Sequence, residues 1–298
     1  MNKTYKSYEP ETLRRLQKVQ TEILRDFISL CDKYDLDYFM LGGSGIGTVR
    51  HQGFIPWDDD IDVAMPRRHY EVLINAVEQE MGDKYQILTP LKDERYACNV
   101  THMQKKGTKF VPEASRNLKC DLCIDIDIFP MDHLPEDKKA RKRQLRKTWF
   151  LSKLLYLCGT PDPILPLEGW KRPFAAAICR LTHYGLKLLK VSPKTIYEKL
   201  LAEETRYNHE RSRYLCPLEV TMADHAYISK QEMYPLRRMA FEGLEVYMPN
   251  QYDTYLKRLF GDYMTLPPRE KRVNHCPYLL DFGDGKKEET GNREPCGE

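Results

Sequence analysis

Hydrophobic and polar residues follow two different periods along the first part of the chain. Over residues 10–34, apolar residues recur at mixed spacings of three and four with charged residues between them, which predicts an amphipathic helix. The short apolar run 38–41 ends at a glycine-rich segment, 42–45, and this order predicts a strand that leads into a turn. Ser44 is expected to cap a short helix that continues through Arg50.

A period of two returns further along the chain. Residues 61–65 predict a strand, and Pro66 stands where a helix would begin. In residues 121–129, leucine or isoleucine at 122, 124, 126 and 128 alternates with Cys123, Asp125, Asp127 and Phe129, so the two aspartates are expected on one face of a second strand. The predicted fold class is therefore α+β, with a mixed β-sheet core flanked by helices.

The composition changes after about residue 136. Lysine and arginine dominate residues 138–147, and two apolar helical stretches follow, at about 149–157 and 174–191. Prolines between these stretches separate their helices. We expect a mainly helical, variable region over 136–234 and a loose tail over 281–298.

The overall composition mainly argues against certain classes of protein. The 298 residues are 41% hydrophobic and 31% charged, as in a soluble globular protein. A formal charge of +3, from 47 basic and 44 acidic residues, does not indicate a dedicated nucleic-acid binder. The first ten residues lack the apolar core of a signal peptide, and no apolar run is long enough to cross a bilayer. These features predict a cytoplasmic protein with reduced thiols.

One pair of cysteines has the spacing of half a zinc site. Cys120 and Cys123 are separated by two residues, and Cys98, His102 and His133 are the candidates for further ligands. The sequence contains no second matched pair. We therefore favour the alternative, in which these are two semi-buried thiols, over a zinc site.

The most informative stretch is Trp57-Asp58-Asp59-Asp60-Ile61-Asp62. In extended backbone Asp58, Asp60 and Asp62 share one face, and Asp59 points away from it. Crowded carboxylates repel one another unless a cation neutralises them, and Mg2+ prefers oxygen ligands. The alternative is a solvated acidic turn. The metal hypothesis is favoured because apolar residues enclose the stretch and Asp125 and Asp127 repeat its geometry.

The glycine-rich segment suggests a place for a phosphate. Glycine lets backbone N–H groups approach an anion closely, and the beginning of a helix favours negative charge. A glycine-rich turn on its own is usually only a turn. Between a strand and an Asp-x-Asp strand, Gly42, Gly43 and Ser44 become candidates for binding a phosphate or nucleotide oxygen.

These motifs together resemble a known family. The turn at Gly42-Gly43-Ser44 followed by Asp60-Ile61-Asp62 resembles the signature of the nucleotidyltransferase superfamily, and the whole run 42–63 resembles the LicD family of phosphocholine transferases. Fukutin-related proteins share a looser form. Residues 126–132, and the run from Phe241 to His275, also resemble that family. The similarity covers about residues 20–135 and 235–278.

The resemblance implies a division of the chain and an activity. A nucleotidyltransferase-like catalytic core would span 1–135, and a C-terminal family segment, 235–280, would complete the site. The implied reaction is a metal-dependent transfer of phosphocholine, or a related phospho-alcohol, from CDP-choline or a similar CDP-alcohol. The acceptor would be a sugar hydroxyl of a cell-surface glycan such as teichoic acid, lipopolysaccharide or capsule.

The resemblance also implies roles for individual residues. Asp60, Asp62 and Asp127 would be catalytic and would bind Mg2+ (or Mn2+) against the donor pyrophosphate, with Asp125 as a further or substitute ligand. Asp127 is our choice for the group that accepts the sugar hydroxyl proton.

Three residues outside the acidic motifs are expected near the phosphates. Arg50 and His51 follow the glycine-rich turn, and a guanidinium offers two parallel donors to phosphate, which favours Arg50. His275 is retained only because its segment resembles the family.

Three other hypotheses remain open at this point. The same carboxylates would serve a nucleotidyltransferase that adds NMP to a small molecule and releases pyrophosphate. A scaffold that has lost catalysis is disfavoured because all the acids are present. The basic run and the helices of 136–191 also permit peripheral contact with the inner face of the cytoplasmic membrane, although basic runs are usually solvated and apolar stripes are usually core.

Overall fold

The computed structural model describes residues 8–288, apart from residues 117, 164, 166, 168, 221, 222 and 286. The helices are α1 (Pro10–Tyr34), α2 (Gly42–His51), α3 (Arg67–Glu80), η1 (Glu113–Ser115), α4 (Lys138–Gly159), α5 (Lys171–Leu188), α6 (Pro193–Glu204), η2 (Thr205–Tyr207), α7 (Ala223–Ala226), α8 (Lys230–Met233), α9 (Tyr252–Phe260) and η3 (Arg269–Lys271). The strands are β1 (Phe39–Met40), β2 (Asp62–Pro66), β3 (Tyr85–Leu88), β4 (Thr101–Lys105), β5 (Lys109–Val111), β6 (Asp125–Leu134), β7 (Tyr214–Pro217), β8 (Ile228–Ser229), β9 (Arg237–Phe241), β10 (Leu244–Met248), β11 (Leu279–Asp281) and β12 (Lys287–Glu288).

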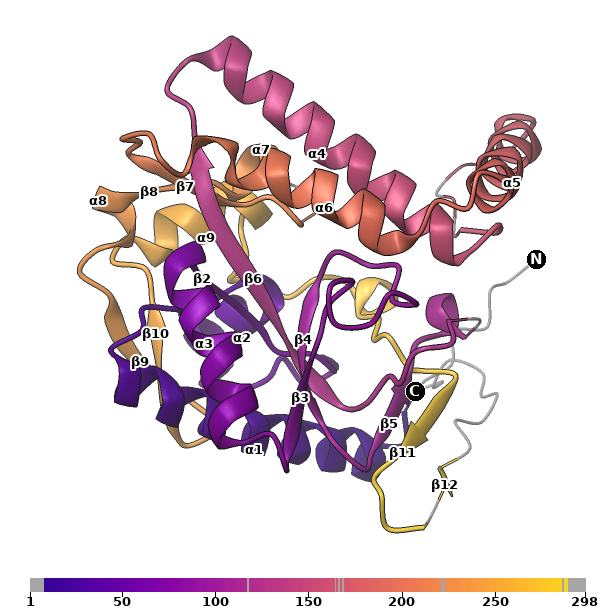
Figure 1. The fold of residues 1–298 in the computed structure, drawn as a ribbon. Helices are drawn as coiled ribbons and strands as arrows, with labels where there is room; N and C mark the ends of the chain where they lie inside the picture. The colour runs from indigo at the N-terminus through magenta and orange to yellow at the C-terminus, as the bar shows by residue number, and fades with distance from the viewer. Residues whose placement is uncertain are drawn as a thin grey trace.

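The long strand β6 organises the central sheet (Figure 1). Within the described residues this sheet has seven strands, with the order β1-β2-β6-β4-β3 along its main path. The other edge of β6 pairs first with β4 and then with β7, which in turn pairs with β8. Only the pair β2–β6 is parallel among these pairings. The α+β class and the mixed sheet are therefore confirmed.

The two faces of this sheet differ in character. Alternate residues of β2 and β6, such as Val63 and Ile128, are buried in one core with Phe27 of α1 and Leu73 of α3. Apolar burial on this face holds the strands in register, because a slip of one residue would turn the whole set outward. The residues between them therefore point to the opposite face, and these include Asp62 and Asp127.

The region between β6 and β7 forms a helical layer of its own. Helices α4 and α6 pack on each other around Leu155, Tyr197 and Leu200, which form a separate small core. Helix α5 lies at the outer edge of this layer (Figure 1). Among the described residues, no helix combines the length and the apolarity needed to cross a membrane.

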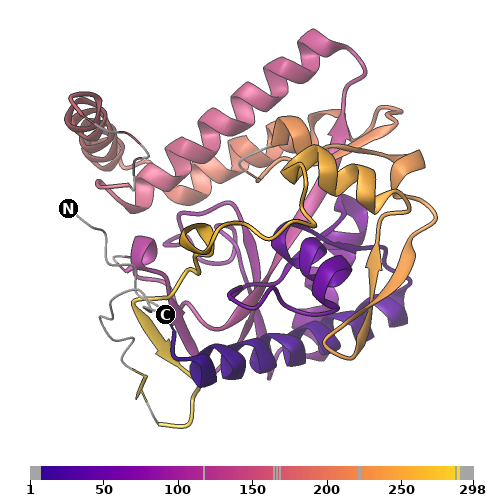
Figure 2. The ribbon, with the colours of Figure 1, turned by 180° about the vertical axis from the view of Figure 1, so that it is seen from behind.

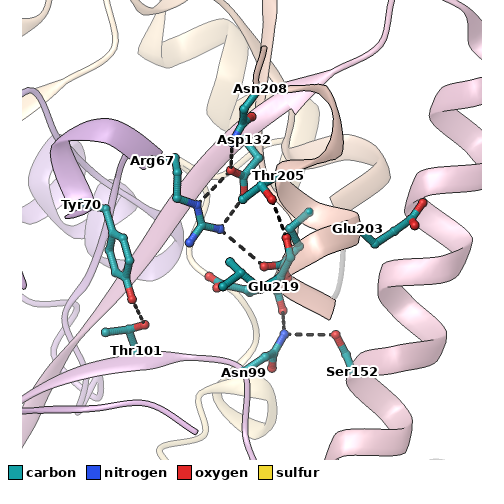
Figure 3. Close-up of polar contacts among 12 residues, drawn as sticks. Arg67, Tyr70, Asn99, Thr101, Asp132, Ser152, Glu203, Thr205, Asn208 and Glu219 are labelled. Carbon is teal, nitrogen blue, oxygen red and sulfur yellow. Dashed lines mark hydrogen bonds and ion pairs between the residues drawn. The ribbon is translucent and has the colours of Figure 1, made fainter. Parts of the chain in front are cut away.

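A buried ion cluster joins this helical layer to the sheet (Figure 3). Arg67, at the start of α3, donates two hydrogen bonds to Asp132 on β6, at 2.9 and 2.5 Å, and its Nη2 lies 3.4 Å from Glu204 at the end of α6. Asn208 also donates to Asp132, at 2.6 Å. The cluster is nearly closed to solvent, since Arg67, Asp132 and Glu204 are all buried.

The structure corrects three boundaries that the sequence predicted. Helix α2 begins at Gly42 rather than after Ser44, so the predicted capping role of Ser44 is wrong. The second acidic strand begins at Asp125 and not at residue 121. Residue 281 and residues 287–288, which we expected in the loose tail, belong to β11 and β12 of a small sheet; residues 289–298 lie outside the described part of the chain.

Candidate functional site

The site is built on β2 and β6, the parallel pair of strands in the described part of the chain. Asp62, the first residue of β2, is the register partner of Asp127 on β6. Partners in a parallel pair present their side chains on the same face, so these two carboxylates lie beside each other. Asp125 precedes Asp127 by two residues and shares its face. The pairing joins two acidic motifs that are separated by more than sixty residues in the sequence.

A histidine from the next strand completes this row. His102 on β4 is the antiparallel register partner of Asp127. Its Nδ1 lies 2.6 Å from Oδ1 of Asp127 and 3.1 Å from Oδ2 of Asp125. Burial lowers the pKa of His102, but the two carboxylates outweigh it and raise that pKa well above the usual range. His102 therefore fixes both aspartates and offsets part of their charge.

The glycine-rich segment packs directly over the aspartates. Gly42 has φ +56°, and a Cβ at this position would lie 3.0 Å from Oδ2 of Asp62. A Cβ on Gly43 would come within 2.8 Å of Oδ2 of Asp58, closer than real Cβ contacts allow. Ser44 contributes its Oγ, which accepts a hydrogen bond from the backbone N–H of Asp62 at 2.9 Å. Glycine is thus needed here so that the first turn of α2 can approach the carboxylates.

Asp59 is turned away from this row and into the protein. Its carboxylate accepts hydrogen bonds from the hydroxyl of Tyr8 at 2.8 Å and from the backbone N–H of His275 at 3.0 and 3.1 Å. The His275 ring also approaches, with Nδ1 3.3 Å from Oδ1 of Asp59 and 3.8 Å from Oδ2 of Asp60. Figure 2 shows the C-terminal segment between α9 and β11 crossing this side of the molecule. Asp59 therefore ties that segment to the site.

The carboxylates at the site raise one another's pKa values. Burial and then the charge of Asp59 raise the pKa of Asp58 to about 6. Removal from bulk water raises the pKa of Asp60 and of Asp62 well above the ordinary range, with the charge of Asp62 acting next on Asp60 and that of Asp127 next on Asp62. Such mutual repulsion is relieved by a bound cation, as an oxygen-rich site for a divalent metal requires.

Among the residues that the structure describes, two groups of side chains could each hold a metal ion. Asp59, Asp60 and His275 form the first group, and His102, Asp125 and Asp127 the second; within each, one ligand atom per residue lies within 4.8 Å of the others. Asp62 belongs to neither group, but it is the register partner of Asp127 in the second and adjoins Asp60 of the first by two positions in the chain. Of the predicted ligands, Asp60 is therefore in the first group and Asp125 and Asp127 are in the second, and Asp62 pairs with the second group through Asp127. Partly exposed carboxylates of this kind suit Mg2+.

Arg50 and His51 end helix α2, whose start packs over the aspartates, and Nε of Arg50 lies 3.4 Å from Nδ1 of His51. The guanidinium of Arg50 donates to the carbonyl of Tyr263 at 2.6 Å. Burial and the nearby Arg272 lower the pKa of Arg50, while Asp58 raises it, so all three charges are close neighbours. Burial and Arg50 lower the pKa of His51. The guanidinium of Arg272 lies over the ring of Trp57, which begins the acidic stretch, 5.0 Å from its centroid.

The cysteine pair is separate from the metal-binding groups. Neither group of potential ligands in the described chain contains Cys120 or Cys123. Burial raises the pKa of each thiol to about 11. His102, once a candidate partner for these cysteines, is engaged by the aspartates, and His133 has its Nδ1 3.0 Å from the carbonyl of Glu210.

Sequence reasoning missed the contributions of His102, Asp59 and Arg272. Thr101, His102 and Met103 alternate buried and partly exposed side chains in the structure, but Thr101 and His102 are both polar, so no hydrophobic period marks this strand in the sequence. Asp59 contacts His275, and Arg272 contacts Trp57, so each contact joins residues more than two hundred positions apart in the sequence. No local pattern reveals such contacts.

Comparison with known proteins agrees with this architecture. Residues 35–153 match the family model described as LicD/FKTN/FKRP, nucleotidyltransferase domain, which includes α2, β2, β4 and β6. The match extends beyond residue 135 and ends inside α4.

Individual relatives extend the similarity. A lipopolysaccharide cholinephosphotransferase LicD of Haemophilus influenzae is 27% identical over 278 residues, which cover 89% of this chain and 96% of that protein. An uncharacterized protein of Rickettsia typhi is 30% identical over 115 residues, 37% of each chain.

The fold is an α+β one with a mixed sheet, and residues 35–153 of the chain match the model of this nucleotidyltransferase domain. Its aspartates meet on adjacent strands under a glycine-rich helix start. The match of residues 35–153 to the LicD/FKTN/FKRP model and the similarity to the Haemophilus influenzae protein confirm the resemblance to the LicD family seen in the sequence.

Proposed function

We propose that this protein transfers phosphocholine, or a closely related phospho-alcohol, from a CDP-linked donor to a sugar hydroxyl of a cell-surface glycan. The observation that carries the proposal is the in-register pair of Asp62 and Asp127 beneath the Gly42-Gly43 start of α2. The similarity to a lipopolysaccharide cholinephosphotransferase supports phosphocholine as the group and a glycan as the acceptor. Teichoic acid and capsule are alternative acceptors of the same chemistry.

The proposed reaction is a single displacement at phosphorus. The oxygen of the sugar hydroxyl forms a bond to the phosphorus that carries choline, and the bond from that phosphorus to CMP breaks. Asp127 accepts the hydroxyl proton. His102, 2.6 Å from Oδ1 of Asp127, holds this carboxylate in place during the transfer. The CMP leaving group keeps the electron pair of the broken bond.

The remaining residues position the donor. The backbone N–H groups of Gly43 and Ser44 are in the first turn of α2, where such groups have no partner within the helix. They would therefore donate to phosphate oxygens of the donor. Arg50 and Arg272 add fixed positive charge at the same edge and suit the donor pyrophosphate. We propose that His51 contributes less to donor binding, because burial and the charge of Arg50 lower its pKa and so disfavour its positively charged form.

A divalent cation, Mg2+ or Mn2+, is the cofactor that the carboxylates fit. Asp62 and Asp127, which are register partners, would hold it together with Asp60 from the first group, with Asp125 beside Asp127 in the second. A bound cation neutralises charge on the transferring phosphoryl group and its leaving group. Burial and then the neighbouring carboxylates raise the pKa values of Asp60 and Asp62, and these raised values support the assignment because a bound cation would stabilise the charged forms.

Product identity tests the proposal against nucleotide addition. The purified protein is incubated with Mg2+, a sugar acceptor and either CDP-choline or a nucleoside triphosphate, and both CMP and pyrophosphate are measured. We expect CMP from CDP-choline and a choline phosphate group on the acceptor by mass spectrometry. Release of pyrophosphate from the triphosphate, with no CMP from CDP-choline, would mean that the protein adds NMP instead. No product from either donor would support a scaffold.

A further inference from the structure

Helix α5 presents an apolar row that the rest of the described chain leaves uncovered. No residue of α5 is buried in the part of the chain that the structure describes. The side chains that form the row are between 49% and 83% exposed; they are Phe174, Ile178, Leu181, Tyr184 and Leu188. Their spacings of three and four place them along one side of the helix.

The opposite side of α5 attaches the helix to the protein. Ala175, Cys179 and Leu186 are partly buried, and Leu186 packs against the small core of α4 and α6. Nδ1 of His183 lies 2.7 Å from the carbonyl oxygen of Leu157, near the end of α4. The helix is therefore fixed in orientation, and its apolar row faces outward. Scattered exposed apolar residues are ordinary, but a continuous row is typical of a binding surface.

Charge decides which partner fits this row. Helix α5 contains four lysines and arginines, and α4 contains eight; neither helix has an aspartate or glutamate. Lys171 and Lys187 stand near the two ends of the apolar row, and the exposed Trp170 precedes it. A second copy of this helix would bring like charges together, which is unfavourable. An anionic surface into which apolar side chains can insert satisfies both features.

We propose that α5 binds the surface of a membrane containing anionic phospholipid, with its apolar row inserted at the headgroup level and the lysines and arginines of α4 and α5 attracted to the lipid charge. Aromatic and aliphatic side chains beside lysine and arginine are the composition of helices that lie in this interface. The sequence alone left this stripe open to a place in the core; the structure shows it uncovered.

The same layer is connected to the candidate site. Asn99 donates a hydrogen bond to the hydroxyl of Ser152 on α4 at 3.2 Å (Figure 3). The ring of nearby Tyr96 packs edge to face with that of His102, with 5.6 Å between the ring centroids. A protein held on a membrane through α5 would thus keep its carboxylates in a fixed relation to the surface. The membrane proposal stands on α5 itself and does not depend on the proposed transfer reaction.

Flotation with lipid vesicles tests this proposal. The full chain is mixed with vesicles of phosphatidylcholine alone or with added phosphatidylglycerol, without donor or acceptor. We expect flotation with the anionic vesicles and a marked loss at high salt. The variant Leu181→Glu/Leu188→Glu should lower the bound fraction by about tenfold or more, because it places charge in the inserted row.

Matched variants make the result specific. Val72 and Leu91 are exposed apolar residues outside the helical layer, and Val72→Glu/Leu91→Glu, with the same added charge, should float like the wild type. Lys171→Glu/Lys187→Glu keeps the row and should also weaken binding. Thermal unfolding of each variant checks its fold. Equal flotation of all the variants would overturn the proposal. The proposal would also be overturned if the protein formed a dimer without lipid and Leu181→Glu/Leu188→Glu dissociated it, because the row would then be a dimer interface. Because flotation involves no turnover, its failure is distinct from a failure of the transferase assay.

Discussion

At the scale of single residues, the site depends on close approach. Asp62 and Asp127 are brought together by strand register, and Gly42 and Gly43 allow the start of α2 to lie against Asp62 and Asp58. His102 then fixes the acidic strand through two contacts at 2.6 and 3.1 Å. Each of these features has a consequence that a single substitution can measure.

Replacing Gly43 by alanine should impair the site more than the fold. The new Cβ would lie 2.8 Å from the carboxylate of Asp58, so that side chain or the helix start must shift. We expect a loss of about tenfold or more in CMP release, because small displacements of positioned groups are costly in catalysis. Gly185→Ala is the control, since a Cβ at that helical position meets open space. Equal activity of the two variants would show that the close approach is unimportant.

His102→Gln should weaken the response to Mg2+. Without the imidazole, Asp127 and Asp125 lose the partner that orients them. Groups that orient metal ligands typically contribute about 10–100-fold in affinity or activity. The measurement is the rate of CMP release over a series of Mg2+ concentrations, with the exposed His225→Gln as control. An unchanged Mg2+ dependence would contradict a positioning role for His102.

At the scale of elements, the helical layer is joined to the sheet by buried charge. Arg67 of α3 connects Asp132 of β6 with Glu204 of α6. The carboxylate oxygens of Glu219 are closed to solvent and have no hydrogen-bond partner among the described residues. Such a cluster contributes less to stability than its attractions suggest, but removing one partner leaves the others uncompensated.

Arg67→Met should destabilise the protein strongly. It would leave Asp132 and Glu204 without their cation, and the loss of one partner of a buried pair typically costs about 3–5 kcal/mol. Urea unfolding measures the change, and Arg68→Met is the control because its exposed side chain is the next residue along α3. A loss no larger than that of the control would mean that the cluster is not structurally important.

The same cluster predicts that stability falls in mild alkali. Burial raises the pKa of Glu204 to about 8, from an ordinary value of 4.5, although Arg67 acts in the opposite direction. A raised pKa means that the folded state holds the proton more tightly, so this contribution is complete below about pH 4.5 and is lost as the pH rises through about 8. We expect Tm to fall between pH 6 and pH 9 by several degrees, for a loss of roughly 1–3 kcal/mol. In Glu204→Gln the fall should be smaller; an equal fall in both proteins would exclude Glu204 as its cause.

At the scale of the whole molecule, local patterns predicted the class of the protein well. The amphipathic helix α1, the acidic strands and the mixed sheet follow from periods of 3.6 and two, and the family resemblance is confirmed. The period of two also placed Asp125 and Asp127 on one face, where both contact His102. These features depend on residues close together in the chain.

Long-range pairings could not be predicted in the same way. Nothing in the local sequence states that β4 lies beside β6, so His102 was considered only as a partner for cysteines. The tie between Asp59 and His275 spans 216 residues. The apolar period of α5 was visible, but periodicity cannot tell a covered face from an exposed one.

The most direct test compares CMP release from CDP-choline by the wild type, Asp62→Asn and Asp127→Asn over a series of Mg2+ concentrations. Asp83→Asn, an exposed acid outside the site, is the matched control. Because the amide removes a charge while keeping the size of the side chain, we expect both site variants to lose activity by about a hundredfold or more, with the wild type and Asp83→Asn active only when Mg2+ is present. A metal-dependent transfer at the Asp62–Asp127 pair would be contradicted if Asp62→Asn released CMP at the wild-type rate. It would also be contradicted if the wild type released CMP at its full rate after chelation of Mg2+.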